Sequence, residues 1–346
     1  MKTRSFFMVA IIATMFVTAC SDQQVVQLKT GGQEISFRLQ GGMPETTTRA
    51  LATTTDNLEA FVVYGTDNVL AVTNDLLFKG VTVARQLGST SPAVFTYAPK
   101  VYYSDGATNA GFFAFAPVSA NIVNNSLNYA TFFTSGASFD YTVPAPDGSG
   151  DAIQEDLLVA LTAPVTPSAT PVSLEFKHAL ARIFVTAENE TPDPVIIKSL
   201  TLKNLYRTGR LAINLSGWNW TLLTNEGDYG FVLAESGVAV PSTTPPDKPY
   251  VTSMEQGMLI LPQLAKNIGA DDVYDTGDFA LEVIYDLANL KGQTKHIVIY
   301  DTATSGEWKF NEGEQYRINI KFTGTAIEFE ITVLPFDTSI IDVTTM

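Results

Sequence analysis

The sequence has almost no cysteine and very little histidine. Its 346 residues include one cysteine, Cys20, and two histidines, His178 and His296. One thiol cannot form an internal disulfide, so a chain of this size must be stabilised by a buried apolar core. No H-E-x-x-H, C-x-x-C, G-x-S-x-G or phosphate-binding glycine motif occurs. We therefore predict a protein that is not an enzyme and that holds no metal or cofactor.

Basic residues are scarce as well. The chain has 21 lysines and arginines against 36 aspartates and glutamates. The first 49 residues hold five of the basic and three of the acidic residues, so the rest carries 16 basic and 33 acidic residues, a net charge of about −17. Such a surface repels phosphate backbones, and no basic stripe offsets that repulsion. These counts exclude nucleic acid as a partner.

The apolar run near the N-terminus is too short to span a membrane. It covers residues 6–17 after a basic start, whereas a membrane-spanning helix needs roughly 20 residues. Residues 17–20 then read Val-Thr-Ala-Cys, a lipobox pattern in which small residues precede an acylated cysteine. We predict that residues 1–20 comprise a lipoprotein signal peptide, which is cleaved, and its lipobox, and that Cys20 stays on the protein and carries the lipid, including palmitate, of an exported lipoprotein. A plain secretory signal with a chance cysteine is the alternative.

The rest of the chain predicts an all-β fold. Thr, Val, Ile, Phe and Tyr are frequent, turn residues recur about every 8–12 positions, and no long segment has a helical period. Apolar residues alternate with polar ones over 279–285, 316–322 and 327–333, and Lys291-Gly292 is expected to turn the first of these into a strand at 296–300. Residues 162–171 carry three prolines and read as a linker or crossing loop. We therefore expect two β-sandwich domains, at residues 50–170 and 171–346.

The segment before the first domain, residues 21–49, contains a strand-like pattern. Ile35, Phe37 and Leu39 alternate with polar residues, so this leader can lie as a strand with one buried face. A Gly-Gly-Met-Pro break follows, and then a polar stretch that presents Arg49-Ala50, a suitable site for an arginine-specific protease. The alternative is a simple tether in which Arg49 is an ordinary surface charge.

Two further patterns have alternative interpretations. Trp218 and Trp220 point to one face of a short predicted strand, where they could stack on sugar rings or pack against the core. The aspartates of residues 271–278 could bind Ca²⁺, but they lack EF-hand spacing, and a solvated turn is the simpler interpretation.

Several stretches together resemble the fimbrillin family, subunits of lipoprotein-derived (type V) pili of gut and oral bacteria. The matching stretches are Thr48-Arg49-Ala50 with Leu58–Tyr64, Lys100–Pro117, Gln154–Ala160, Phe176–Ile183, Val195–Leu205 and Trp308–Leu334. The resemblance implies two transthyretin-like β-sandwich domains in tandem. It also implies export through the periplasm, an outer-membrane lipid anchor, cleavage between Arg49 and Ala50, and assembly by donor-strand exchange with other pilus subunits.

In that scheme the C-terminal tail of one subunit fills the groove that the leader of another has left. The donor residues here would be Phe336, Ile340, Ile341 and Val343. The position of the subunit in the filament stays open, and a tip adhesin or a surface glycan-binding lipoprotein, with a receptor on another cell, is the alternative function.

Overall fold

The computed structural model describes most of the chain after residue 31. The described residues are 32–40, 58–69, 76–88, 93–118, 120, 122–126, 133, 137–145, 154–162, 164–223, 226–231, 233–242, 250–251, 257–269, 273–301, 306–323 and 327–335. Every named element in these ranges is a β-strand, which confirms the predicted all-β class. Across the same residues, the structure forms no helix with the length and apolar character to cross a membrane.

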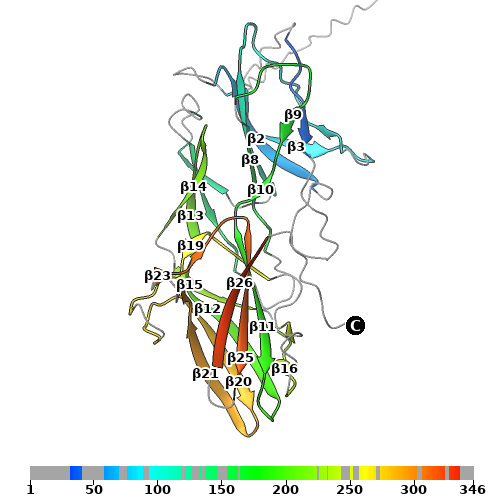
Figure 1. The fold of residues 1–346 in the computed structure, drawn as a ribbon. Helices are drawn as coiled ribbons and strands as arrows, with labels where there is room; N and C mark the ends of the chain where they lie inside the picture. The colour runs from blue at the N-terminus through cyan, green and yellow to red at the C-terminus, as the bar shows by residue number, and fades with distance from the viewer. Residues whose placement is uncertain are drawn as a thin grey trace, which may run out of the picture. The chain divides into compact units, whose positions relative to one another are not determined.

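A six-stranded sheet forms the centre of the N-terminal part (Figure 1). Its order is β10-β8-β5-β2-β3-β4. The strands are β2 (Ala60–Asp67), β3 (Phe78–Arg85), β4 (Phe95–Thr96), β5 (Ala110–Ala116), β8 (Leu158–Leu161) and β10 (Lys177–His178). All seven residues of β5 are buried, because this sheet is covered on both faces. Such continuous burial explains why β5 reads as an unbroken apolar run instead of an alternating one.

Each face of the six-stranded sheet has its own apolar cluster and its own cover. One face packs with a four-stranded sheet of order β14-β13-β7-β6, and the ring centroids of Phe113 and Phe139 lie 5.3 Å apart there. The other face packs with a two-stranded layer of β1 and β9. The strands of these covers are β1 (Phe37–Leu39), β6 (Ile122–Ser126), β7 (Ala137–Thr142), β9 (Val172–Leu174), β13 (Thr208–Asn214) and β14 (Gly217–Leu222).

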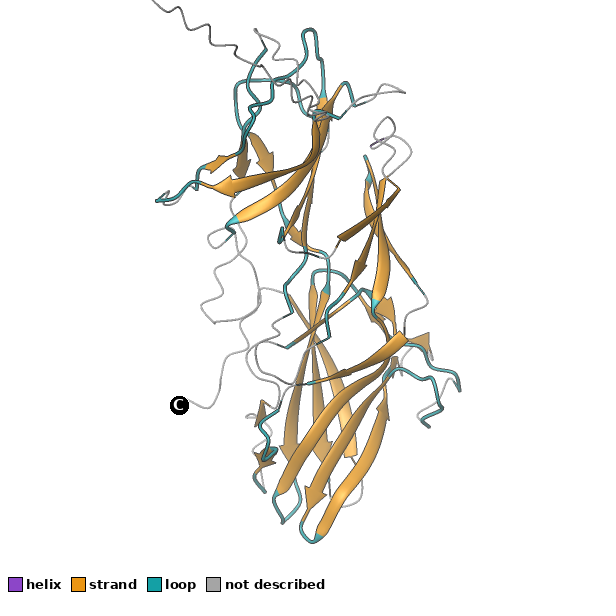
Figure 2. Ribbon diagram, turned by 180° about the vertical axis from the view of Figure 1, so that it is seen from behind, coloured by secondary structure: helices purple, strands orange, loops and turns teal. Residues whose placement is uncertain are grey.

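The C-terminal part contains two five-stranded sheets, seen from behind in Figure 2. The first sheet has the order β17-β11-β25-β26, and β18 also pairs with β11. The second sheet has the order β15-β12-β20-β21, and β16 also pairs with β12. The bounds are β11 (Ala181–Asn189), β12 (Val195–Tyr206), β15 (Glu226–Gly230), β16 (Val238–Val240), β17 (Tyr250–Val251), β18 (Met258–Ile260), β20 (Ala280–Leu287), β21 (Leu290–Val298), β25 (Glu314–Phe322) and β26 (Ile327–Pro335). Two short pairs complete the fold: β19 (Gln263–Leu264) with β24 (Lys309–Phe310), and β22 (Tyr300–Asp301) with β23 (Gly306–Glu307).

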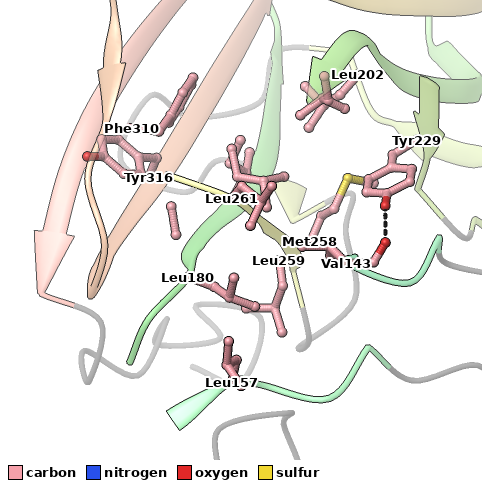
Figure 3. Packing of buried hydrophobic residues seen from close by; sticks show 14 of the residues in the cluster. Val143, Leu157, Leu180, Leu202, Tyr229, Met258, Leu259, Leu261, Phe310 and Tyr316 are labelled. Carbon is pink, nitrogen blue, oxygen red and sulfur yellow. Dashed lines mark hydrogen bonds between the residues drawn. The ribbon is translucent and has the colours of Figure 1, made fainter. Parts of the chain in front are cut away.

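Apolar side chains from both of these sheets meet in one core cluster (Figure 3). In β25, Tyr316, Ile318, Ile320 and Phe322 are buried and the residues between them are half-buried, so the predicted alternation is confirmed. The hydroxyl of buried Tyr229 donates a hydrogen bond to the carbonyl of Val143, which ties β15 to the chain that follows β7. A buried tyrosine needs such a partner for its polar end.

The turn after β20 lies at a different position from the one predicted from the sequence. The turn predicted at Lys291-Gly292 is wrong: β20 ends at Leu287, β21 begins at Leu290, and the turn contains Ala288 with φ 51°. Gly292 instead lies inside β21, and its amide donates to Asp286 across a shift in register. A glycine inside a strand often marks such an irregularity, and here it was taken for the turn itself.

The strands on either side of residue 170 pair with one another. β9 and β10, which follow this position, pair with β1 and β8, and β13 of the later chain pairs with β7 of the earlier chain. Residues 162–171 contain one isolated bridge, between Val165 and Ala110, and otherwise form no strand where they are described. The division into domains at residues 50–170 and 171–346 stays a prediction.

Candidate functional site

The leader forms part of the layer that covers the six-stranded sheet. Backbone pairing holds it on both sides. On one side, the amide of Ile35 donates to Val101 (3.0 Å) and the amide of Tyr103 donates to the carbonyl of Gln33 (3.1 Å). On the other side, β1 runs parallel to β9, with Phe37 opposite Val172. The leader therefore lies between two strand-like segments, 101–103 and 172–174, which would each lose a neighbour if it left.

Leader side chains alternate in burial as a strand with one apolar face should. Ile35 has 0% and Phe37 5% of its surface exposed, and Leu39 is half-buried, whereas Glu34, Arg38 and Gln40 are exposed. Burying two or three such side chains contributes roughly 3–9 kcal/mol before the cost of ordering the backbone is counted. The leader is thus an integral part of this apolar core in the uncut chain.

The ring of Phe37 occupies a slot between four other aromatic rings, which we call the ring slot. Its centroid lies 5.3 Å from that of Phe78, 5.4 Å from Phe112, 6.1 Å from Phe61 and 6.1 Å from Tyr97. Three of these pairs have near-perpendicular planes, the edge-to-face geometry that aromatic pairs favour. Because β2, β3 and β5 each supply one ring, the slot belongs to the sheet and not to the leader.

Tyr97 places one polar group, its hydroxyl, at the otherwise apolar ring slot. It donates a hydrogen bond to the carbonyl of Ile35, in the leader, and lies 3.4 Å from the carbonyl of Val101. Burial raises the pKa of Tyr97 from its ordinary 10.0 to about 12. The protonated phenol is therefore the form that the folded chain stabilises.

The outward side of the leader is held by weaker, exposed contacts. Arg38 donates from Nε to the hydroxyl of Ser173 (2.6 Å), and Glu34 pairs with Lys100 (2.7 Å). Each partner of the ion pair keeps more than two-fifths of its side-chain surface exposed, at 42% and 44%. Exposed pairs contribute about 0–1 kcal/mol, so the leader is held mainly by its buried face and its backbone.

Two glycines fit the leader and the ring slot to each other. A Cβ on Gly32 would lie 2.4 Å from the carbonyl oxygen of Tyr103, so the leader can approach this segment only without a side chain there. A Cβ on Gly65 would lie 2.4 Å from the ring of Phe112. The ring of Phe112 can therefore occupy this position only because residue 65 has no side chain.

An open groove adjoins the C-terminal end of the leader strand. Its volume is about 420 Å³, and its lining includes Gln40, Tyr103, Thr162, Thr170, Ser173 and Glu175. The lining also includes apolar residues such as Leu161 and Val172, so the groove is of mixed polarity, in contrast with the ring slot.

The leader is held by three parts of the chain: the ring slot and the segments 101–103 and 172–174. We call these three parts together the leader seat.

Several predicted site residues lie outside the described residues. They are the lipidation site Cys20, the cleavage site Arg49-Ala50, and the donor residues Phe336, Ile340, Ile341 and Val343. Their roles stay predictions. Of the residues predicted to take part in cleavage and strand exchange, the structure describes those of the leader strand, Ile35, Phe37 and Leu39.

The two tryptophans of β14 use their indole N–H groups within the chain. Trp220 donates to the carbonyl of Ala179 (2.9 Å), and Trp218 donates to Glu312 (3.1 Å). Both rings are half-buried and pack against the larger apolar cluster. Burial raises the pKa of Glu312, and the hydrogen bond from Trp218 opposes that rise. A contact with glycans stays a prediction for this pair.

Each histidine contacts an acidic side chain. The Nδ1 atom of His178 contacts the carboxylate of Asp156, and both residues are buried. Burial lowers the pKa of nearby Arg182 to about 10, and the charge of Asp156 opposes that change. His296 contacts Glu282 (3.0 Å) and stacks on Tyr274 with centroids 4.0 Å apart.

The acidic loop before β20 is organised by one buried carboxylate. Asp278 has 0% of its surface exposed, and its two oxygens accept hydrogen bonds from the amides of Ile268 and Asp275, each 2.6 Å long. This residue is a structural cap and not part of a solvated turn. Across the part of the chain that the structure describes, no three His, Cys, Asp or Glu side chains gather closely enough to hold a metal ion.

Sequence reasoning found the leader but missed the ring slot and Tyr97. The slot is built from residues far apart in the chain, Phe61, Phe78 and Phe112 among them, and no local spacing connects them. The one available signal was composition: 21 phenylalanines and 13 tyrosines are many for one chain to bury.

Comparisons with known proteins agree with this architecture. A family model described as fimbrillin-like matches residues 48–335. A fimbrial protein from Bacteroides vulgatus has a similar structure over 88% of this chain and 100% of its own, with a TM-score of 0.57 and 13% identity. A protein assigned to cell adhesion from Bacteroides uniformis is similar over 88% of this chain and 98% of its own, with a TM-score of 0.52 and 15% identity. No curated protein matches the sequence.

Proposed function

Because this chain belongs to the fimbrillin-like family, we propose that it is a pilus subunit that assembles by exchanging its leader strand for a strand of another subunit. The observation that carries the proposal is the burial of Ile35 and Phe37 in a seat built entirely by later parts of the chain. A leader that filled no seat could leave without creating a binding site. This leader would leave behind an apolar slot and two unpaired backbone edges, which invite another strand to add.

The sequence around the leader fits a removable element. In our proposal the protein is exported through the periplasm as a lipoprotein on Cys20, reaches the outer membrane, and is cut between Arg49 and Ala50 by an arginine-specific protease. Before the cut, the leader is an intramolecular partner with a high effective concentration at its seat. After the cut, this advantage is lost and a competing strand can replace it.

The energies make exchange feasible. The buried face of the leader contributes roughly 3–9 kcal/mol, while ordering about eight residues costs on the order of 8–16 kcal/mol in backbone entropy. Net hydrogen bonding of about 0.5–1.5 kcal/mol per bond offsets much of the difference. Because the favourable free energy of burial and hydrogen bonding is close to the entropic cost of ordering, the leader binds well when tethered and poorly when free.

The experiment compares the purified wild-type chain with an Arg49→Ala variant after treatment with an arginine-specific protease. We expect the cut wild type to bind a fluorescent peptide with the leader sequence, residues 32–40, and the variant to exclude it because its own leader stays tethered. Arg38→Ala is the matched control, because it removes an exposed leader arginine and keeps the cleavage site. Binding of the peptide by the uncut Arg49→Ala protein, or no binding by the cut wild type, would contradict the proposal.

A further inference from the structure

The leader seat has a shape that discriminates between incoming strands. Its central position is the ring slot, where Phe37 contacts rings from three strands of the sheet and Tyr97. On either side, two residues away along the leader, the seat holds the aliphatic side chains of Ile35 and Leu39. The leader therefore presents the pattern aliphatic-x-aromatic-x-aliphatic to its seat.

The tail of this chain lacks that pattern. Within residues 336–346, the two apolar side chains that are spaced two apart are Ile341 and Val343. Placing both on the seat, in either direction, puts one of them into the ring slot and leaves a serine or threonine at one flanking position. A branched aliphatic side chain in the place of a phenyl ring leaves empty volume among four rings that cannot collapse freely.

The aromatic residue of the tail can reach the slot only at a cost. If Phe336 took the place of Phe37, its neighbours two residues away would be Leu334 and Thr338. Leu334 lies at the end of β26, opposite Gln315 of β25. This alignment therefore requires the end of β26 to separate from β25, and it still places a threonine at one flanking position.

We infer that the leader seat is built to receive a donor strand from a different subunit, one with an aromatic side chain between two aliphatic ones, and not the tail of a second copy of this chain. The inference rests on the proposed function and adds the identity of the partner. It assigns this subunit to a position where its seat faces an unlike neighbour.

The test uses the full chain in which the recognition sequence of a specific protease replaces residues 44–49. The chain is cut at this sequence after it has folded. Three fluorescent peptides then compete for the seat: the leader sequence of residues 32–40, the same peptide with Phe37→Val, and the tail sequence of residues 334–346. We expect the leader peptide to bind, and the Phe37→Val peptide to bind about 100-fold more weakly. The tail peptide should be no stronger than the Phe37→Val peptide.

Gain of function gives the second arm of the test. Ile341→Phe and Val343→Phe are introduced separately in the full chain, because either residue can face the slot. At least one variant should self-assemble after cutting at least tenfold faster than the unaltered tail. Tail binding as tight as leader binding, or self-assembly that neither variant accelerates, overturns the inference while leaving strand exchange intact. Failure of the leader peptide itself to bind overturns the proposed function as well.

Discussion

Phe37 shows how one side chain can link a removable segment to a permanent core. It is 5% exposed and lies within 6.1 Å, centroid to centroid, of four rings supplied by later parts of the chain. Arg38, the next residue, is exposed and makes one hydrogen bond to Ser173. Removing the side chain of Phe37 should therefore lower the free energy of unfolding more than removing that of Arg38.

We predict that Phe37→Ala lowers the free energy of unfolding by about 3–5 kcal/mol, the range for deleting a buried phenyl ring. Arg38→Ala should change it by less than about 1 kcal/mol, since the bond it removes is exposed. Urea unfolding of the uncut chain measures both values. Equal effects of the two substitutions would show that the leader is not seated as described.

Tyr97 gives the leader seat a dependence on alkaline pH. Its pKa is raised from 10.0 to about 12, so the folded chain holds the phenol proton where the unfolded chain releases it. The stabilisation from this hydroxyl is fully present below pH 10 and is lost as the pH rises from about 10 towards 12.

We therefore predict that the stability difference between wild type and Tyr97→Phe is largest below pH 10 and shrinks above it. Taking the difference removes the contribution of other buried tyrosines, which both proteins share. Denaturant unfolding at pH 8, 10 and 11.5 provides the comparison. A difference that does not change between pH 8 and 11.5 would contradict the assigned role of the Tyr97 hydroxyl.

At the scale of elements, the leader is a strand with neighbours on both sides. The amide of Tyr103 donates to Gln33, and the amide of Val172 donates to Ser36 (2.8 Å). Both acceptors belong to the leader, so both amides lose their partners when the leader departs. An amide inside the sheet, that of Thr162 bonded to Phe112 (2.9 Å), does not depend on the leader.

Hydrogen exchange should report this difference. In the uncut chain we expect the amides of Tyr103 and Val172 to be protected, and we expect their protection to fall at least tenfold once the leader is cut and displaced. The amide of Thr162 serves as the internal control and should keep its protection. Unchanged protection at Tyr103 and Val172 after loss of the leader would contradict the pairing described here.

Elements with a clear two-residue period could be predicted from the sequence, and contacts between distant elements could not. In β25 and in the leader, alternating apolar residues report directly which face is buried. The parallel pairing of β1 with β9 joins segments about 135 residues apart, and each strand has three residues, too few for a pattern. Gly292 misled the turn prediction because a strand irregularity and a turn both favour glycine.

At the scale of the whole molecule, the N-terminal part of the sequence combines three functions in our proposal. A lipid on Cys20 directs export, the leader strand keeps the seat filled, and Arg49-Ala50 lets a protease end that state. The net charge of about −17 in residues 50–346 disfavours nonspecific association between copies, so assembly must come from a specific contact. Exchange at the leader seat supplies such a contact.

A reversible disulfide across the leader and its seat tests this account most directly. Arg38 and Ser173 lie opposite each other in the β1–β9 pair and their side chains are in contact, so a double substitution to cysteine, with Cys20→Ser, places two thiols in reach of each other. After cutting within residues 44–49, we predict that the oxidised protein excludes an added peptide with the leader sequence, residues 32–40, and that reduction lets this peptide bind. Each single-cysteine variant should bind the peptide under both conditions. Peptide binding by the oxidised, cross-linked protein as tight as by the reduced one would contradict the account, because its leader cannot have left the seat.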